Sequence, residues 1–198
     1  MIMYVVKYSG PFGFIKPWTA VRDSETYSQQ FLTESELFGM ECKLFPELLP
    51  ECYGIKKIKS YRLTYGSINQ QQEQIQPRGW NEKGRGKAKT YERPYAVLTR
   101  GILINPILYL CFDSIIDAEV ASTQHICLCR NEDLLFPEEK IIETTEFEFN
   151  NDEDRFYGFE LVFERTEHSF MVGYNRFNNN QPMYGWLKTV GNPVKQIY

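Results

Sequence analysis

The chemically most distinctive part of the sequence is the stretch RGWNEKGRGKAKTYER, residues 78–93, which holds six basic and two acidic residues in a chain of net charge −4. Lysine and arginine neutralise phosphates, and the rings of Trp80 and Tyr91 offer faces on which bases stack without sequence preference. Three glycines would let the backbone bend around a nucleic-acid strand. This combination is typical of contacts to single-stranded RNA. The candidate RNA-binding residues here are Arg78, Trp80, Lys83, Arg85, Lys87, Lys89, Tyr91 and Arg93.

The charge of the chain is unevenly distributed. Residues 132–167 contain 13 acidic and 3 basic residues, a net charge of −10, whereas residues 78–93 carry 6 − 2 = +4. Such asymmetry indicates one face that attracts an anion and another that repels it or meets a basic neighbour. The simpler alternative is a solvated acidic surface together with a solvated basic loop.

Two other arrangements of reactive residues resemble known kinds of site. The string GWNEKGRGKA, residues 79–88, has alanine where a phosphate-binding loop has serine or threonine, so nucleotide hydrolysis is excluded. His125, Cys127 and Cys129 alternate along the chain, but a zinc site needs four ligands and no second cluster complements these three. We therefore expect ordinary cysteines in a buried strand and no metal site.

Acid–base catalysis has few candidates. The chain has two histidines, His125 and His168, and neither lies beside a nucleophile motif. One of them could serve a metal-independent ribonuclease, because cleavage at a 2′-hydroxyl needs only a base, an acid and a cation. The carboxylates of residues 152–154 could hold Mg²⁺, but their asparagine neighbours are typical of a solvated turn. We predict no catalytic residue and no cofactor, with the ribonuclease as the alternative.

Length and composition set the class of protein. A chain of 198 residues with 42% hydrophobic and 24% charged residues suffices for one globular domain or two small fused ones. No apolar stretch approaches the ~20 residues of a membrane span, and the N-terminal sequence has neither a basic leader nor a cleavage site. Five cysteines, an odd number without a C-x-x-C pair, favour a reducing compartment. We expect a cytoplasmic protein that does not bind a membrane.

The elements that must position these residues are mostly strands. One helix is predicted at 33–45, where Thr33 and Glu36 form a capping box and apolar residues follow at helical spacing. Gly39 within it costs ~1 kcal/mol relative to alanine, which suggests close packing against a neighbour. Strands are predicted at 2–8, 54–65, 95–104, 106–115, 138–149 and 183–190, with a strand hairpin at 156–165 and 168–177, and a helical turn followed by a strand at 117–129.

The overall pattern predicts an α+β protein with about seven strands and one helix. Residues 66–93 have no apolar period, which indicates a long loop or a projecting hairpin. The glycines and aromatic residues at 173–191 fit a hairpin turn, with a ligand-facing glycine loop as the alternative. The cations expected on the exposed side of strand 54–65 are Lys56, Lys57, Lys59 and Arg62.

The order of features in residues 4–48 resembles the RAMP superfamily of CRISPR-associated proteins, in particular the Cas five family, whose members bind the 5′ handle of the guide RNA. In that family a first strand ends in a G-P-F or G-P-M turn, an irregular aromatic and basic segment follows, and a threonine-serine helix start precedes an internal glycine. The matching residues here are Gly10, Pro11 and Phe12, then Lys16, Trp18 and Arg22, then Thr33, Glu34, Ser35 and Gly39.

The resemblance, which covers residues 2–115, implies a ferredoxin-like (RRM-like) RAMP sheet with extra carboxy-terminal strands. It implies one domain over 1–198, with a basic β-hairpin "thumb" inserted at about 66–94, and it adds Lys16, Trp18 and Arg22 to the RNA-binding candidates. The implied function is a non-catalytic subunit of a type I or type III effector complex that anchors the 5′ handle and contacts the multi-copy backbone subunit and the large subunit. The alternatives are a metal-independent endoribonuclease that processes guide RNA precursor, and a protein-only adaptor.

Overall fold

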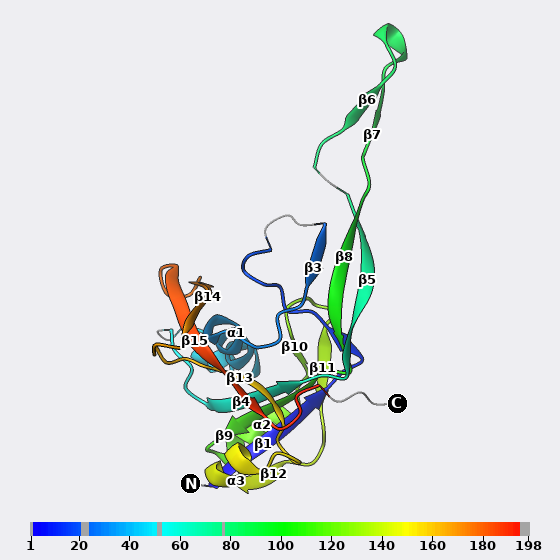
Figure 1. Ribbon diagram of the computed structural model, residues 1–198. Coiled ribbons are helices and arrows are strands. Elements are labelled where there is room, and N and C mark those ends of the chain that lie inside the picture. The colour runs from blue at the N-terminus through cyan, green and yellow to red at the C-terminus, as the bar shows by residue number, and fades with distance from the viewer. Residues whose placement is uncertain (1, 21–23, 51–52, 77, 195–198) are drawn as a thin grey trace.

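A computed structural model describes residues 2–20, 24–50, 53–76 and 78–194. Figure 1 shows a body built on one large antiparallel sheet, from which a long β-hairpin projects. The predicted α+β class is confirmed, because strands dominate and three α-helices accompany them in the described part of the chain. No described helix is long and apolar enough to cross a membrane.

The large sheet contains nine strands. They are β1 (Ile2–Ser9), β4 (Ile58–Thr64), β9 (Ile107–Phe112), β10 (Ile126–Cys127), β11 (Leu134–Pro137), β12 (Ile142–Thr145), β13 (Gly158–Val162), β14 (Phe170–Asn175) and β15 (Gln181–Val190). Their order is β10-β11-β1-β9-β4-β13-β15-β14, and β12 also pairs with β1. These pairings are antiparallel.

Two helices, α1 (Glu34–Leu44) and α2 (Ile115–Ser122), cover one face of this sheet. The chain runs β1–α1–β4 and then β9–α2–β11, and the two strands of each unit are separated in the sheet by a strand of the other. Leu37 of α1 and Ala118 of α2 belong to the same buried cluster as Tyr8 and Leu110 of the sheet. The main core therefore lies between these helices and the central strands.

Helix α1 begins where the sequence predicts it. Thr33 is the N-cap, and its backbone N–H donates to the Oε2 atom of Glu36 at 2.7 Å, as expected for the capping box. Leu37, Met40 and Leu44 are buried against the sheet. The expectation of close packing at Gly39 is wrong for the described chain, since no atom lies within 4 Å of the position that a Cβ would occupy there.

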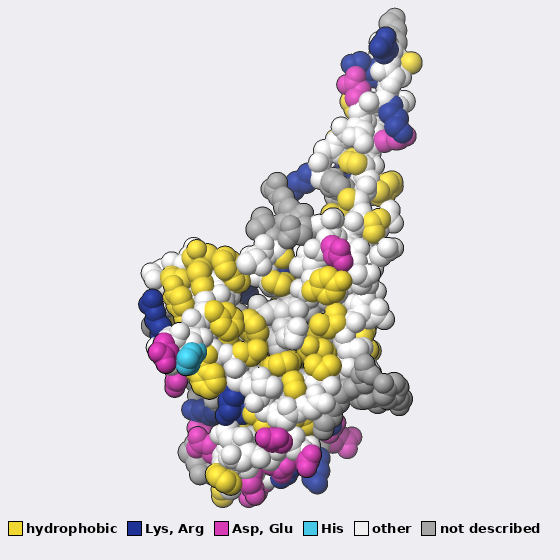
Figure 2. Space-filling view, viewed as in Figure 1, with side chains coloured by type: hydrophobic (Ala, Val, Ile, Leu, Met, Phe, Trp, Pro, Cys, Tyr) yellow, Lys and Arg dark blue, Asp and Glu magenta, His cyan; other side chains and the backbone are white. Residues whose placement is uncertain are grey.

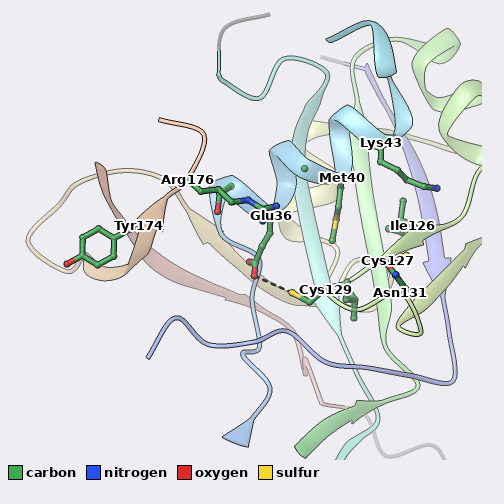
Figure 3. A pocket seen from close by; sticks show the side chains of 12 residues that line it. Glu36, Met40, Lys43, Ile126, Cys127, Cys129, Asn131, Tyr174 and Arg176 are labelled. Atoms are coloured by element: carbon green, nitrogen blue, oxygen red, sulfur yellow. Dashed lines mark hydrogen bonds between the residues drawn. The ribbon is translucent and has the colours of Figure 1, made fainter. Parts of the chain in front are cut away.

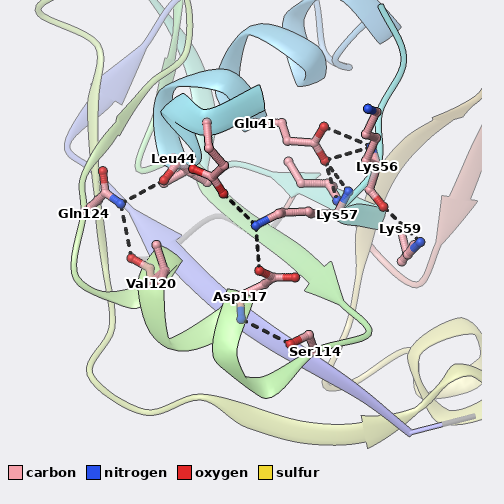
Figure 4. Close-up of polar contacts among 11 residues, drawn as sticks. Glu41, Leu44, Lys56, Lys57, Lys59, Ser114, Asp117, Val120 and Gln124 are labelled. Atoms are coloured by element: carbon pink, nitrogen blue, oxygen red, sulfur yellow. Dashed lines mark hydrogen bonds and ion pairs between the residues drawn. The ribbon is translucent and has the colours of Figure 1, made fainter. Parts of the chain in front are cut away.

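A buried carboxylate of α1 holds the segment that leads into β4. Glu41 is fully buried, and its carboxylate accepts backbone N–H groups from Lys56 at 3.0 Å, Lys57 at 2.6 Å and Ile58 at 2.8 Å (Figure 4). Three neighbouring backbone donors, one buried and two partly buried, thus share one acceptor group. The carboxylate fixes the register in which the chain enters β4 beneath the helix.

We expect Glu41→Ala to lower the free energy of unfolding by about 3 kcal/mol, because it leaves one buried and two partly buried N–H groups without their acceptor. Urea unfolding followed by circular dichroism measures the change. The matched control is Glu47→Ala, which removes an exposed carboxylate paired with Lys57 at 2.9 Å and should cost less than about 1 kcal/mol. Equal midpoints for the two variants would contradict the role of Glu41.

The opposite face of the sheet is also covered, which corrects the prediction for strand 54–65. Arg62 is fully buried there, whereas Lys56 and Lys59 are exposed as expected and Lys57 is half-buried in an ion pair. Helix α3 (Glu146–Asn151) packs over this face, and its Phe149 joins a second buried cluster with residues of β1 and β9. The alternation of the strand was read correctly, but its second face meets a helix instead of solvent.

Two further segments differ from the prediction. Residues 138–149 form the short strand β12 followed by α3, because Thr145 and Glu148 make a second capping box that starts a helix. Residues 156–165 and 168–177 do not pair with each other as a hairpin; β15 lies between β13 and β14 and pairs with both. The hairpin turn is the one at Asn179 and Asn180, whose φ angles are 47° and 54°.

The projecting hairpin, residues 67–104, confirms the second of the two possibilities for the segment without apolar period. Its base is a second sheet in which β8 pairs with β5 on one side and with β2 and β3 on the other. Its outer end is a short antiparallel pair closed by a 3₁₀ turn. The elements are β2 (Phe12–Gly13), β3 (Glu25–Tyr27), β5 (Ser67–Ile75), β6 (Asn81–Lys83), β7 (Thr90–Glu92) and β8 (Ala96–Ile104), and a 3₁₀ helix at Pro46–Leu48 follows α1.

Candidate nucleic-acid interface

The outer end of the projecting hairpin carries residues 78–93 away from the body (Figures 1 and 2). Trp80 is 60% exposed and Tyr91 is 59% exposed. Among the described residues, the polar contacts of the side chains of this segment are with other atoms of the hairpin and not with the acidic region 132–167. The rings and cations are therefore presented to solvent.

Two of the predicted lysines are paired across the hairpin. The Nζ atom of Lys83 lies 2.5 Å from Glu92 Oε2, and the Nζ atom of Lys89 lies 2.5 Å from Glu82 Oε1. All four side chains are about half exposed or more, so each pair contributes only about 0–1 kcal/mol. An RNA phosphate can therefore displace either glutamate at a small cost in free energy. The sequence alone did not indicate that these two lysines already have carboxylate partners.

The remaining cations of the segment differ in their surroundings. The Arg93 guanidinium lies 4.9 Å from the centre of the Trp80 ring and donates to Gln76 Oε1 at 3.3 Å, which orients the indole. Arg78 and Arg85 are exposed and have no salt bridge within the described residues. The side chain of Lys87 lies outside the described part of the structure.

One glycine of this segment, Gly84, is required by the hairpin's own turn. Gly84 has a φ angle of 93°, and a Cβ there would lie 2.3 Å from the carbonyl oxygen of Ala88. Only glycine fits such a close, left-handed turn. Gly84 therefore closes the tip of the hairpin, whereas at Gly79 and Gly86 no described atom lies within 4 Å of the position of a Cβ.

The amino-terminal candidates lie near the body, apart from residues 78–93. Lys16 is exposed, Trp18 is 46% exposed, and Arg22 lies outside the described residues. The Trp18 ring packs edge-on to Tyr174 of β14, with 5.9 Å between ring centres, and rests on the backbone of Gly173. A Cβ at Gly173 would come within 3.2 Å of Trp18, so the glycine makes room for the indole. The structure thus joins Trp18 to the carboxy-terminal strands.

A second exposed ring at the base of the hairpin was missed from the sequence. Tyr27 of β3 is 49% exposed, and its ring lies directly on Gly101 of β8, where a Cβ would meet Cδ1 at 2.1 Å. Its hydroxyl donates to Glu25 at 3.1 Å and accepts from the Gln70 side chain at 3.0 Å. A glycine inside a predicted strand was the available signal, because it marks a close approach of another group. Tyr27 is a rigid, solvent-facing platform for stacking.

The described surface has two hollows, one on each side of the exposed face of α1. A hollow of about 600 Å³ opens towards residues 126–131 (Figure 3), and another of about 460 Å³ opens towards Tyr53 and Phe177. Gly39, Lys43 and Arg176 line both hollows. The sequence had marked Arg176 only as part of a glycine-containing hairpin turn.

No acid–base constellation is assembled in the described residues. His125 lies beside Phe136, and His168 is exposed beside Glu167, so the two histidines have different neighbours. In the larger hollow the Cys129 thiol donates to Glu36 Oε1 at 3.6 Å, and loss of hydration raises the pKa of Cys129 to about 12. Burial also raises the pKa of Glu36. A thiol that stays protonated at neutral pH is a poor nucleophile.

The predicted cysteine-bearing strand is also shorter than expected. Only Ile126 and Cys127 are in strand conformation, so His125 and Cys129 do not share one face of a strand with Cys127. No group of three or more histidine, cysteine, aspartate or glutamate side chains within the described residues could hold a metal ion.

Comparison with known proteins gives a structural likeness without a sequence relative. A scan against protein-family models finds no match, and a search of curated proteins finds none either. Among solved structures, the fold is similar to that of a chain in a CRISPR RNA-guided surveillance complex. The TM-score is 0.52 at 13% sequence identity, over 97% of this chain and 90% of that one. The two chains therefore share a fold over nearly their whole lengths.

Proposed function

We propose that the protein is a non-catalytic RNA-binding subunit of a CRISPR ribonucleoprotein effector complex, in which it anchors the 5′ handle of the guide RNA. The observation that carries the proposal is the projecting hairpin, which presents cations and two exposed rings on a body whose fold is similar to a chain of a CRISPR RNA-guided surveillance complex. Cations that bind phosphates and rings that stack on bases are the means by which single strands are held.

The strand order supports placement in the RAMP superfamily, and the Cas five family within it is proposed from the sequence features of residues 4–48. Strands β11, β1, β9 and β4 with helices α1 and α2 have the order and directions of a ferredoxin-like sheet, in which two β–α–β units interleave. In this proposal the domain spans 1–198, residues 66–94 are the thumb, and β13, β14 and β15 are the additional carboxy-terminal strands. A type I and a type III complex fit equally.

The RNA path in this proposal runs from the outer end of the hairpin to its base. Residues 78–93 contact the phosphates and stack on bases at the tip, and Lys16, Trp18 and Tyr27 continue the contact at the body. The glycine-supported positions of Trp18 and Tyr27 support this extension, because a ring fixed against backbone loses little freedom when a base stacks on it.

The partners proposed besides guide RNA are the backbone and large subunits of the effector, in the cytoplasm. The acidic end of the molecule suits a protein contact: Phe147 of α3 is 75% exposed between Glu146 and Glu148. An exposed ring surrounded by carboxylates complements an apolar pocket with a basic rim.

The test is incubation of the purified protein with repeat-derived RNA in EDTA, followed by gel analysis of both the complex and the RNA. We expect a retarded complex that contains intact RNA. Specific cleavage that is abolished by His125→Ala or His168→Ala would instead establish the ribonuclease. Failure to retain any single-stranded RNA, at low as well as at physiological salt, would leave the protein-only adaptor.

A further inference from the structure

The exposed face of α1 contains a glycine that the fold itself does not need. Gly39 lies in the middle of the helix, where glycine is less stable than alanine. At Gly101 and Gly173 a Cβ would collide with or crowd an aromatic residue of the same chain, but at Gly39 no described atom lies within 4 Å of that position. The bare backbone at Gly39 is therefore available to a group from outside the chain.

Gly39 lines both of the hollows described above. The side chains of two cations, Lys43 and Arg176, also line both hollows. Lys43 comes from the next turn of α1, and Arg176 follows the end of β14 (Figure 3). Neither side chain forms a salt bridge with another described residue, although Arg176 is near enough to Glu36 to influence its titration. In the smaller hollow Lys43 and Arg176 are the charged residues, so this side carries two positive charges.

The smaller hollow also has aromatic walls. Phe38 contacts Tyr53 and Phe177 edge-on, with ring centres 4.9 Å and 5.0 Å apart, and the planes of Tyr53 and Phe177 lie within 12° of each other. The Arg176 guanidinium lies over the Phe177 ring at 4.7 Å. Two cations beside a bare stretch of backbone, next to a group of rings, match the phosphate and the base of a nucleotide.

We propose that this surface, made by Gly39, Lys43, Arg176 and the aromatic walls of the smaller hollow, binds one nucleotide of a single-stranded RNA. The phosphate passes over Gly39 between the two cations, and the base lies against Phe177 and its neighbours. The inference rests on the proposed function and adds a second RNA contact, on the helical face of the body, to the one on the projecting hairpin. A side chain at position 39 would fill the space through which the phosphate passes.

Substitution of the glycine separates binding from folding. Gly39→Ala should raise the melting temperature by about 2–4 °C, since alanine favours the helix and meets no atom of the described chain. The same variant should bind a short fluorescein-labelled single-stranded RNA of mixed sequence more weakly, and Gly39→Leu should weaken it about tenfold by fluorescence anisotropy. A gain in stability with a loss of affinity is the signature of a glycine kept for a ligand.

A second pair of variants tests the cations independently of the glycine. Lys43→Met together with Arg176→Met should reduce the slope of log affinity against log salt by roughly 0.7 for each cation removed. The matched control is Lys56→Met together with Arg155→Met, two exposed cations outside the hollows, which should leave the slope unchanged.

The outcomes distinguish this inference from the proposed function. If Gly39→Leu and the double methionine variant bind RNA like the wild type, while loss of the hairpin cations weakens binding, the helical surface is not an RNA site and the proposed function stands. If the wild type retains no RNA, both fail. A third outcome is that these variants keep the RNA affinity of the wild type but no longer copurify with an acidic protein that the wild type retains. That outcome would overturn the inference and assign the surface to a protein contact.

Discussion

Loss of the four cations nearest the tip of the projecting hairpin is expected to weaken binding of single-stranded RNA about a hundredfold at ~50 mM salt. Each phosphate contact to a single strand contributes about −0.7 to the slope of log affinity against log salt, so the slope should flatten by about 2 to 3. The loss stays below the sum of four free cations because two of the lysines already have glutamate partners. Anisotropy titrations at several salt concentrations measure both quantities for the alanine variant of Lys83, Arg85, Lys87 and Lys89.

Two comparison variants make this prediction specific to the hairpin. Removing four exposed or half-exposed cations from the body should change affinity by no more than about threefold, because none of them lies on the projecting hairpin or lines either hollow beside α1. Glu82→Gln together with Glu92→Gln should tighten binding, since it frees Lys83 and Lys89 and removes two negative charges. An unchanged affinity and slope for the hairpin variant would remove the hairpin from the RNA contact. The body cations are Lys56, Lys59, Lys140 and Arg155.

The part of the candidate interface that depends on amino-acid composition could be predicted from the sequence. The part that depends on which residues contact one another in the fold could not. Charge and aromatic content alone marked the outer end of the hairpin. Cross-strand pairing of Lys83 with Glu92 requires the register of β6 and β7, which a three-residue strand does not reveal. The roles of Tyr27 and Gly39 depend on their surroundings in the fold. The Tyr27 ring lies on the backbone of a glycine, whereas no described atom lies within 4 Å of the position of a Cβ at Gly39.

The same distinction holds for the fold. The capping box at Thr33 predicted α1, and an equivalent box at Thr145 was present but overlooked, because the alternating segment around it also fits a strand. The helix is favoured there because Phe149 finds Phe156 and the covered face of the sheet, a tertiary contact that no local pattern reports. Likewise, insertion of β15 between β13 and β14 replaced an expected hairpin by pairings that depend on the whole sheet.

Arg62 carries the largest stability effect that we expect from a single substitution. It is fully buried; its Nη1 atom forms a salt bridge with Glu160, its Nη2 atom donates to Asn150 Oδ1 at 2.9 Å, and its guanidinium lies 4.6 Å from the Phe149 ring. Lys188 donates to the same Asn150 oxygen at 2.6 Å. Arg62 thus links β4 to β13 and α3 across the second face of the sheet, and Lys188 joins β15 to the same asparagine of α3.

We expect Arg62→Ala to lower the free energy of unfolding by about 3–5 kcal/mol, because it leaves Glu160 without its partner in the interior and removes the contact that holds α3. Urea unfolding gives the magnitude, and hydrogen exchange should reveal early loss of protection in residues 146–151. Arg155→Ala is the control: that guanidinium also lies over a ring, Phe156 at 4.9 Å, but it is exposed and should cost less than about 1 kcal/mol.

A double variant then separates the ion pair from the packing. Arg62→Met with Glu160→Gln removes both charges while retaining much of the buried volume, so it should recover part of the stability lost in Arg62→Ala. Recovery is expected because the buried Nε atom of Arg62 has no hydrogen-bond partner within the described structure, and methionine would remove that unsatisfied group. If the double variant were less stable than Arg62→Ala, the charges themselves, and not the filling of the space beneath α3, would hold this face together.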